Sequence, residues 1–285
     1  MRADLHVHSS ASDGTDPPAE VMRRAAQAGL DVVALTDHDT VAGHAEARQA
    51  LAGSVLAGSG DHSLALLPGM ELSCRLDGRS LHLLAYLFDP GQPELAAELS
   101  RIRGDRVLRA RAMVDRLAGL GVDITWEQVA AIAGPAVVGR PHIARAMAAS
   151  GAVASPRAAF TRDWIADGGR AYVGRYALDP VRAIGLVRAA GGVAVLAHPR
   201  AGRDTLVSDE QIAGLAAAGL AGLEVFHPDQ SGTERAGLLA LAHDLALVAT
   251  AGSDDHGSLT GHRIGAETVG AEAYRALLAR VPSAP

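Results

Sequence analysis

The chain has little of several residue types that mark common protein classes. Cys74 is its only cysteine, which excludes an intramolecular disulfide and a cysteine-based zinc cage. Aromatic residues make up 3% of the chain, which argues against base-stacking surfaces as the main means of holding a ligand. Lysine is absent, and all 26 basic residues are arginine. Either a GC-rich genome or selection for forked contacts with phosphate would produce this bias.

Charge and hydropathy exclude further classes. The net charge of −6 gives no sign of general nucleic-acid binding, so no DNA-binding surface is expected. No uninterrupted apolar run approaches the roughly 20 residues of a membrane span. Asp4 and His6 stand where the apolar core of a signal peptide would lie. We therefore expect a cytoplasmic protein with no membrane partner, and the sequence gives no indication of its oligomeric state.

The apolar residues, 48% of the chain, are arranged as alternating strands and helices. Helices are predicted over Pro18–Ala28, Val41–Leu51 and Ser208–Ala218, with Asp16 as the N-cap of the first. This alternation predicts an α/β fold, either a barrel or a wound sheet with helices outside. Seven short apolar runs are typical of buried parallel strands: Ala3–Val7, Asp31–Thr36, Leu64–Leu72, Leu81–Phe88, Gly192–Ala197, Gly222–Phe226 and Ala246–Thr250.

One segment between the fourth and fifth strands breaks this alternation. The arginine-rich run from Arg101 to Arg116 is typical of one long helix, and three more helices are predicted after it. We interpret residues 101–168 as a helical insertion that caps the barrel formed by residues 1–100 and 169–285. The three further helices are predicted over Trp126–Ala133, Arg140–Ser150 and Pro156–Ala166.

Seven of the twelve histidines fall within or just beyond an apolar strand. The C-terminal ends of parallel strands meet at a common mouth, where functional groups converge. Imidazole is a good ligand for Zn, Mn or Fe, and carboxylates bridge such ions. His6 and His8 share one face of their strand, because side chains repeat every two residues. By contrast, His44 and His243 are expected on helix surfaces.

Carboxylates accompany these histidines. Asp13 either supplies a ligand or caps the Ser-Asp-Gly turn, and the sequence leaves both open. His38 is predicted to be a ligand, with Asp37 orienting it or acting in catalysis, while Asp39 either orients a ligand or caps the next helix. Glu71 ends an apolar run, where a carboxylate is costly unless it is paired or bound to metal, so we predict a bridging ligand.

The remaining candidate ligands follow the same logic. His82 lies inside an apolar run, and His198 ends the fifth strand. Asp254 and His256 stand two residues apart after the seventh strand, so they share a side of the chain. No Gly-x-Ser-x-Gly elbow or phosphate-binding P-loop is present, so serine-hydrolase and nucleotide-triphosphatase chemistry are disfavoured. These residues predict a multinuclear metal site.

Six separately spaced motifs occur in the order found in the PHP (polymerase and histidinol phosphatase) family, and the chain resembles that family over its whole length. The resemblance implies a distorted (β/α)7 barrel, with an inserted helical cap domain, that holds three divalent ions. The motifs are Asp4-Leu5-His6-Val7-His8, Ser12-Asp13-Gly14, Leu35-Thr36-Asp37-His38-Asp39, Gly69-Met70-Glu71, Ala197-His198-Pro199 and Gly252-Ser253-Asp254-Asp255-His256.

The resemblance assigns the ligands to three ions of Mn, Fe or Zn. Glu71 would bridge the first two ions. Phosphate monoester hydrolysis by a metal-bridging hydroxide is the mechanism expected. The leaving alkoxide would take its proton from His198 or His227, and the sequence leaves the choice open. The ligands are His6, His8, Glu71 and Asp254 for the first ion, His82 and His198 with Glu71 for the second, and Asp13, His38 and His256 for the third.

Within the family, the layout resembles the bacterial 3′,5′-nucleoside bisphosphate phosphatases, a group related to 5′-3′ exoribonucleases. The resemblance implies that basic residues of the insertion grip the phosphate that is not hydrolysed, with Arg140, His142 and Arg170 as candidates. The expected partner is a phosphorylated small molecule or nucleotide, extending to the 5′ ends of short RNA. The alternatives are a phosphatase for histidinol phosphate or another small molecule, and a non-catalytic, metal-stabilised interaction module.

Overall fold

A computed structural model describes residues 1–52, 63–201 and 206–282. The chain divides into two compact units, one formed by residues 1–96 with 178–285 and the other by residues 97–177. The insertion predicted over residues 101–168 falls inside the second unit, and its role as a cap stays a prediction. Among the residues described, no helix combines the length and apolarity that a bilayer crossing needs.

The first unit is built on a sheet whose strands follow one another in chain order. Hydrogen bonds across its two edges nearly close it into a barrel. The N–H of Asp254 donates to the carbonyl of His6 (2.8 Å), and that of His8 donates to the carbonyl of Asp255 (2.9 Å). Within the described residues the strands are β1 (Ala3–Val7), β2 (Val32–Leu35), β3 (Ala65–Leu76), β4 (Arg79–Tyr86), β5 (Val193–Leu196), β6 (Gly222–Phe226) and β7 (Val248–Ala251).

The prediction that all strands are parallel is wrong for β4. This strand runs antiparallel to both β3 and β5, whereas β1–β2–β3 and β5–β6–β7 are parallel. Asp77 and Gly78 alone connect β3 to β4, with φ angles of 49° and 80°. Two left-handed residues make a tight hairpin turn, and a parallel connection needs a crossover of a dozen or more residues. The result is an α/β barrel with a mixed sheet.

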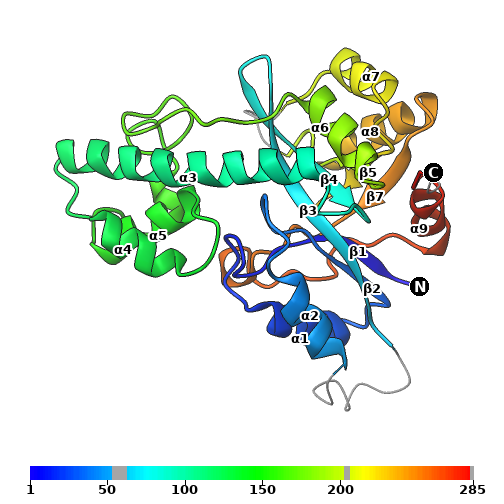
Figure 1. Cartoon of the computed structure of the whole chain (residues 1–285), viewed down its shortest axis with the longest axis horizontal. Coiled ribbons are helices and arrows are strands. Elements are labelled where there is room, and N and C mark those ends of the chain that lie inside the picture. The colour runs from blue at the N-terminus through cyan, green and yellow to red at the C-terminus, as the bar shows by residue number, and fades with distance from the viewer. Residues whose placement is uncertain (53–62, 202–205, 283–285) are drawn as a thin grey trace. The chain divides into compact units, whose positions relative to one another are not determined.

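Strand β2 shows how the barrel is packed. Val33 and Leu35 lie in a cluster with apolar residues of α1 (Pro18–Gln27) and α2 (His44–Ala52). Val32 and Ala34, on the opposite face, lie in a cluster with side chains from β1, β3, β4, β5 and β7. Both faces of the strand are therefore buried, as expected of a barrel surrounded by helices. Helices α6 (Pro180–Ala189), α7 (Asp209–Ala217), α8 (Gly232–Asp244) and α9 (Ala271–Leu278) complete the unit (Figure 1).

Two local predictions for this unit are wrong. Pro17, not Asp16, is the N-cap of α1, and the Asp16 carboxylate lies 2.7 Å from Nε of Arg24 instead. His44 is buried, with Nε2 lying 2.9 Å from the carbonyl oxygen of Gly69. Helical periodicity alone does not show which polar side chain at a helix start turns inward.

The second unit is helical and has its own core. It contains most of α3 (Pro93–Gly119) together with α4 (Trp126–Ala133) and α5 (Arg140–Ala149) (Figure 1). Apolar residues of all three helices form one buried cluster. The helix predicted over Pro156–Ala166 is wrong beyond Ala159, because only a short 3-10 helix, η2 (Pro156–Ala159), forms. Thr161 and Asp163 in the remainder favour turns over helix.

The hairpin turn gives a prediction about stability. Gly78 has a φ of +80°, so Gly78→Ala forces an alanine into the left-handed region and should destabilise the protein by about 1 kcal/mol. Gly185, inside α6, has open space around it, and Gly185→Ala should stabilise the protein by up to about 1 kcal/mol. Urea denaturation of both variants measures the two effects. Equal changes of the same sign would contradict the turn geometry.

Candidate metal centre

The predicted ligands come together at one end of the barrel. His6 and His8 lie at the end of β1, and His198 follows β5. Asp254 and His256 follow β7. The antiparallel hairpin contributes from within its strands, and the remaining groups lie in loops that follow β1 and β2. These further groups are Glu71 on β3, His82 on β4, Asp13 after β1 and His38 after β2.

The first group of potential ligands contains His6, His8, Glu71 and Asp254. The Nε2 atoms of His6 and His8 lie 3.0 Å apart. Glu71 Oε2 lies 3.3 Å from the first of these nitrogens and 3.1 Å from the second. Asp254 Oδ1 lies 3.3 Å from both. Two imidazoles and two carboxylates thus point at one small volume, as the sequence predicts.

Glu71 is shared with a second group, because its other oxygen faces further imidazoles. Oε1 lies 2.7 Å from Nδ1 of His82 and 3.0 Å from Nε2 of His198. Oε2 lies 3.1 Å from Nδ1 of His38. The structure brings His38, Glu71 and His82 within ligand spacing of one another. His198 contacts the same carboxylate, so both oxygens of Glu71 are positioned for a bridging role.

The third group centres on Asp13. Its Oδ1 lies 3.3 Å from Nε2 of His256, and its Oδ2 lies 3.7 Å from Nε2 of His38. His8 also belongs to this group, through Nδ1 at 3.7 Å from Asp13 Oδ1. The geometry therefore adds His8 to the predicted set of Asp13, His38 and His256. It also favours the ligand alternative for Asp13 over turn capping.

Electrostatics keep the carboxylates of the site ionised. Burial raises the pKa of Glu71, but neighbouring imidazoles, that of His38 first, outweigh burial and hold the pKa well below its usual range. Burial likewise opposes the imidazoles around Asp254, whose pKa is also held well below its usual range. Burial lowers the pKa of His38 to about 3 despite nearby carboxylates. Burial opposes a proton on His6 and His8, but the surrounding carboxylates outweigh it, holding the pKa of His6 well above its usual range and raising that of His8 to about 10. A bound cation would take the place of the protons on these imidazoles.

The donor set fits divalent cations. Four ligands at about 2.0–2.1 Å from one tetrahedral ion stand about 3.3 Å apart, close to the spacing in the first group. His38 Nδ1 is buried and makes no hydrogen bond, although Glu71 Oε2 lies 3.1 Å away. Two ligand atoms that lie this close, yet are poorly aligned for a hydrogen bond, are expected where both point toward a shared ion. Nitrogen with oxygen donors suit Mn, Fe or Zn.

Aspartates next to the ligands position the loops that carry them. The Asp37 carboxylate is fully buried and accepts hydrogen bonds from the N–H of Ser9 (2.8 Å) and the hydroxyls of Ser9 and Ser12 (both 2.7 Å). Asp39 accepts from the N–H of Ser73 at 2.8 Å. These contacts are those of positioning residues, so Asp37 is better described as holding the Asp13 turn than as a catalytic group.

His198 and His227 occupy different places in the site. His227 Nε2 lies 3.3 Å from Asp254 Oδ2, while its Nδ1 accepts from the N–H of Asp229 at 3.1 Å. The second contact places the proton of a neutral imidazole on Nε2, facing the site. His198 and Asp254 have φ angles of 25° and 48°, in the left-handed region that non-glycine residues rarely adopt. Such strain is typical of functional sites.

Glu224 belongs to the site but is absent from the sequence prediction. It is fully buried on β6, 3.0 Å from Nδ1 of His6, and it accepts from the N–H of His198 at 2.7 Å. A carboxylate on Nδ1 keeps that nitrogen protonated and leaves Nε2 free to bind metal. The signal was available, since a glutamate inside the apolar run of β6 is as costly as Glu71 on β3.

The three residues predicted to bind substrate lie in the second unit and differ in their burial and hydrogen-bond partners. Arg140 begins α5, pairs with Asp167 and donates to the carbonyl of Ile165 at 3.3 Å. His142 is buried, and its Nδ1 accepts from the N–H of Gly139 at 3.0 Å, so it organises the first turn of α5. Arg170 is exposed. The structure brings Arg140 and His142 onto one helix turn.

Two arginines absent from the sequence prediction lie beside Arg140. Arg106 and Arg109 of α3 line with it a hollow too narrow for a water molecule, and we call these three residues the arginine cluster. Arg109 is 7% exposed, and its Nη2 has no hydrogen-bond partner among the described residues. Burial, together with the charges of Arg140 and Arg175, lowers the pKa of Arg109 to about 10. A buried cationic group with an unused donor is suited to an anion.

Comparison with known proteins agrees with this geometry. The PHP domain matches residues 4–99. A 3′,5′-nucleoside bisphosphate phosphatase from Chromobacterium violaceum is 34% identical over 91% of this chain and 89% of its own length. A 5′-3′ exoribonuclease from Haemophilus influenzae is 34% identical over 89% of both chains. The chain therefore belongs to the PHP family of metal-dependent phosphoesterases.

Other relatives extend the range of activities and support the fold. A phosphoribosyl 1,2-cyclic phosphate 1,2-diphosphodiesterase from Eggerthella lenta is 34% identical over 90% of this chain and 95% of its own length. The crystal structure of a candidate metal-dependent phosphoesterase from Bifidobacterium adolescentis superimposes with a TM-score of 0.89 at 34% identity, covering 99% of this chain and 96% of that one. An amidohydrolase from Chromobacterium violaceum, solved with bound sulfate, gives 0.83 at 33% identity, covering 99% and 98%.

Removing the shared carboxylate tests the centre. In Glu71→Gln, both oxygens that face the imidazoles lose their negative charge, so affinity for Mn²⁺ should fall by more than about a hundredfold. Mass spectrometry of metal bound per chain after Mn²⁺ loading measures the loss. Glu272→Gln, at an exposed position on α9, is the control and should bind like the wild type. Full phosphoesterase activity in Glu71→Ala would disprove the metal mechanism.

Glu224 gives a second, milder prediction. Glu224→Gln replaces an acceptor with an amide that can donate to Nδ1 of His6, which moves the imidazole proton to Nε2 and blocks the metal-binding lone pair. Metal affinity should fall by about 10–100-fold, as is usual for groups that orient a ligand. Titration with Mn²⁺, followed by the gain in melting temperature, measures it. Glu210→Gln, exposed on α7, should leave the titration unchanged.

Proposed function

We propose that this chain removes the 3′-phosphate from nucleoside 3′,5′-bisphosphates. The observation that carries the proposal is the arginine cluster of the helical unit, a set of guanidinium groups suited to pairing with a second phosphate. The metal centre itself supports phosphoester hydrolysis in general. The relatives named as a bisphosphate phosphatase and an exoribonuclease support a substrate with more than one phosphate.

In this proposal the metal centre acts on the scissile phosphate. Divalent ions bound by the predicted ligands would supply Lewis acidity and a hydroxide at neutral pH. Glu71 holds both neighbouring groups of imidazoles in one place, and Glu224 fixes the orientation of His6. His227 presents a protonated Nε2 toward the site, which makes it the better candidate than His198 for giving a proton to the leaving oxygen.

The arginine cluster acts on the phosphate that stays. Arg109 contributes an unused N–H, and Arg140 adds a guanidinium that is 27% exposed. Guanidinium forks match phosphate oxygens in pairs, and a bound phosphate would relieve the repulsion between the buried cations. Binding energy from this remote group would be used to align the scissile one. His142 serves the same phosphate indirectly, by holding the turn on which Arg140 lies.

A second candidate is hydrolysis of a cyclic phosphate diester. The Eggerthella lenta relative, named for such an activity, matches this chain at the same identity as the bisphosphate phosphatase. Both candidate substrates carry a phosphate group that can occupy a cationic site. They differ in whether the bond that is hydrolysed belongs to a phosphate monoester or to a cyclic diester. Histidinol phosphate carries one phosphate and makes no use of the arginine cluster. Short 5′-phosphorylated RNA carries its 5′-phosphate where the bisphosphate has the retained phosphate, and its first phosphodiester where the bisphosphate has the 3′-phosphate to be hydrolysed.

One panel separates these candidates. Turnover is measured with Mn²⁺ on adenosine 3′,5′-bisphosphate, phosphoribosyl 1,2-cyclic phosphate, histidinol phosphate and a short 5′-phosphorylated RNA. The bisphosphate is expected to give the highest kcat/KM. A cyclic diester turned over faster than the bisphosphate would favour the second candidate. No turnover of any compound by metal-loaded protein would favour the non-catalytic interaction module.

The arginine cluster predicts a change in KM. Arg109→Lys keeps a positive charge but loses the guanidinium fork, so KM for adenosine 3′,5′-bisphosphate should rise about tenfold or more. Arg157→Ala, exposed on η2, is the control and should leave KM as it is. Arg170→Ala tests the remaining predicted residue by the same assay. An unchanged KM in both Arg109→Lys and Arg140→Ala would exclude the arginine cluster as a phosphate site.

A further inference from the structure

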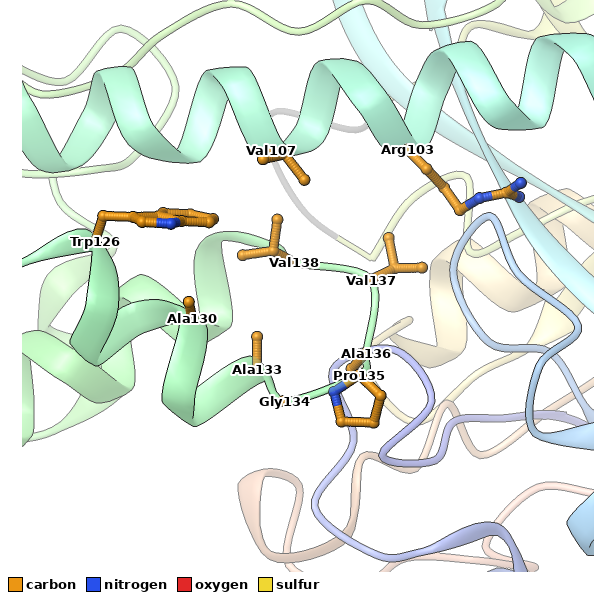
Figure 2. Close-up of a pocket in the computed structure, with 10 residues that line it drawn as sticks. All are labelled: Arg103, Val107, Trp126, Ala130, Ala133, Gly134, Pro135, Ala136, Val137 and Val138. Atoms are coloured by element: carbon orange, nitrogen blue, oxygen red, sulfur yellow. The ribbon is translucent and has the colours of Figure 1, made fainter.

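The helical unit contains a hollow that the metal centre and the arginine cluster leave unexplained. It has a volume of about 240 Å³ and lies between α3 and α4. Figure 2 shows Trp126 at one end and Arg103 at the other, with Ala130 and Ala133 along one side and Val107 of α3 facing them. The segment from Gly134 to Val138 completes its wall.

The sequence of α4 creates this hollow. Trp126, Ala130 and Ala133 are spaced by four and three residues, so they lie on one face of the helix. The two alanines leave open a space that larger side chains would fill, and Trp126 closes one end, with the guanidinium carbon of Arg111 over its ring at 4.7 Å from the ring centre. Apart from Arg103 at one end, the rest of the wall is mainly aliphatic, with Val107, Val137 and Val138. Such a space accepts a flat, largely apolar group.

The hollow borders the arginine cluster. Val138 lines both, and Gly139, the next residue, lines the arginine hollow. A Cβ added at Gly139 would lie 3.4 Å from Nη1 of Arg106, so Gly139 lies close to the arginine cluster. On α3, Arg106 lines one hollow, and Val107, the next residue, lines the other from a neighbouring face of the helix. A ligand with an anionic group beside a flat apolar group would span both.

We propose that this hollow binds the nucleobase of a nucleotide whose retained phosphate lies in the arginine cluster. The proposal rests on the proposed function and deepens it, since it names the part of the substrate that the helical unit recognises. A volume of about 240 Å³ lies below the ~300–1,000 Å³ of pockets for drug-sized ligands, so it suits one ring system. Stacking against an aromatic side chain is sequence-tolerant, because every base has a π-face.

The first test compares substrates with and without a base. Ala130→Leu fills the hollow, and Ala131→Leu, exposed on the same helix, is the matched control. The ratio of kcat/KM for adenosine 3′,5′-bisphosphate to that for methyl riboside 3,5-bisphosphate is measured with Mn²⁺. Ala130→Leu should lower this ratio about tenfold, and Ala131→Leu should keep the wild-type ratio. A ratio that Ala130→Leu leaves unchanged would overturn the proposal.

The second test needs no turnover and so separates this proposal from the proposed function. Trp126 and Trp164 are the two tryptophans of the chain, and Trp164→Phe leaves Trp126 as the single tryptophan, whose fluorescence is excited selectively over that of the tyrosines. Adenosine 5′-monophosphate should quench this fluorescence, whereas ribose 5-phosphate should not. Quenching without bisphosphatase activity would retain the nucleotide site and reject the reaction. Activity without quenching would reject the nucleobase site, and equal quenching by both compounds would show that the hollow does not read the base.

Discussion

The structure of the metal centre depends on one buried carboxylate surrounded by imidazoles. Both oxygens of Glu71 are occupied, and five histidines from four different parts of the barrel lie within 3.3 Å of them. A charge this deeply buried is costly unless it is compensated on all sides. The near-closure of the sheet provides the compensation, because only a barrel brings the ends of β1, β5 and β7 to the middle of the β3–β4 hairpin.

Further residues around Glu71 hold its charge-compensating partners in place. Glu224 holds His6 and the backbone of His198, and Asp37 holds the turn that carries Asp13. The left-handed backbone at His198 and Asp254 also orients ligands, because a side chain at the end of a strand must be turned back toward the barrel axis. The strained backbone at these two residues thus fixes the directions of their side chains. The helical unit differs from the metal centre, because its buried charges are cations, on α3 and α5, and Arg109 keeps a donor without a hydrogen bond.

Much of the metal centre could be predicted from the sequence, because a histidine or carboxylate at the end of an apolar strand has few structural uses. Strand positions could be predicted because each strand is a short apolar run. The direction of β4 was not inferred, although Asp77-Gly78 between two apolar runs is a strong hairpin signal. Arg106 and Arg109 could not be singled out, because α3 carries many arginines and periodicity does not say which face another helix will cover. Their burial is a tertiary property.

The hydrogen bonds that join β1 to the segment after β7 have a consequence for how the protein is made. The first ion would be held by His6 near the beginning of the chain and by Asp254 near its end. During synthesis, which proceeds from the N-terminus, three of the four ligands in that group, His6, His8 and Glu71, are made long before the fourth, Asp254. The full ligand set of this ion is therefore present only once the segment after β7 has been made, and a product terminated before that segment keeps three ligands without the fourth. Metal occupancy in the cell would thus report on synthesis of this segment as well as on metal supply.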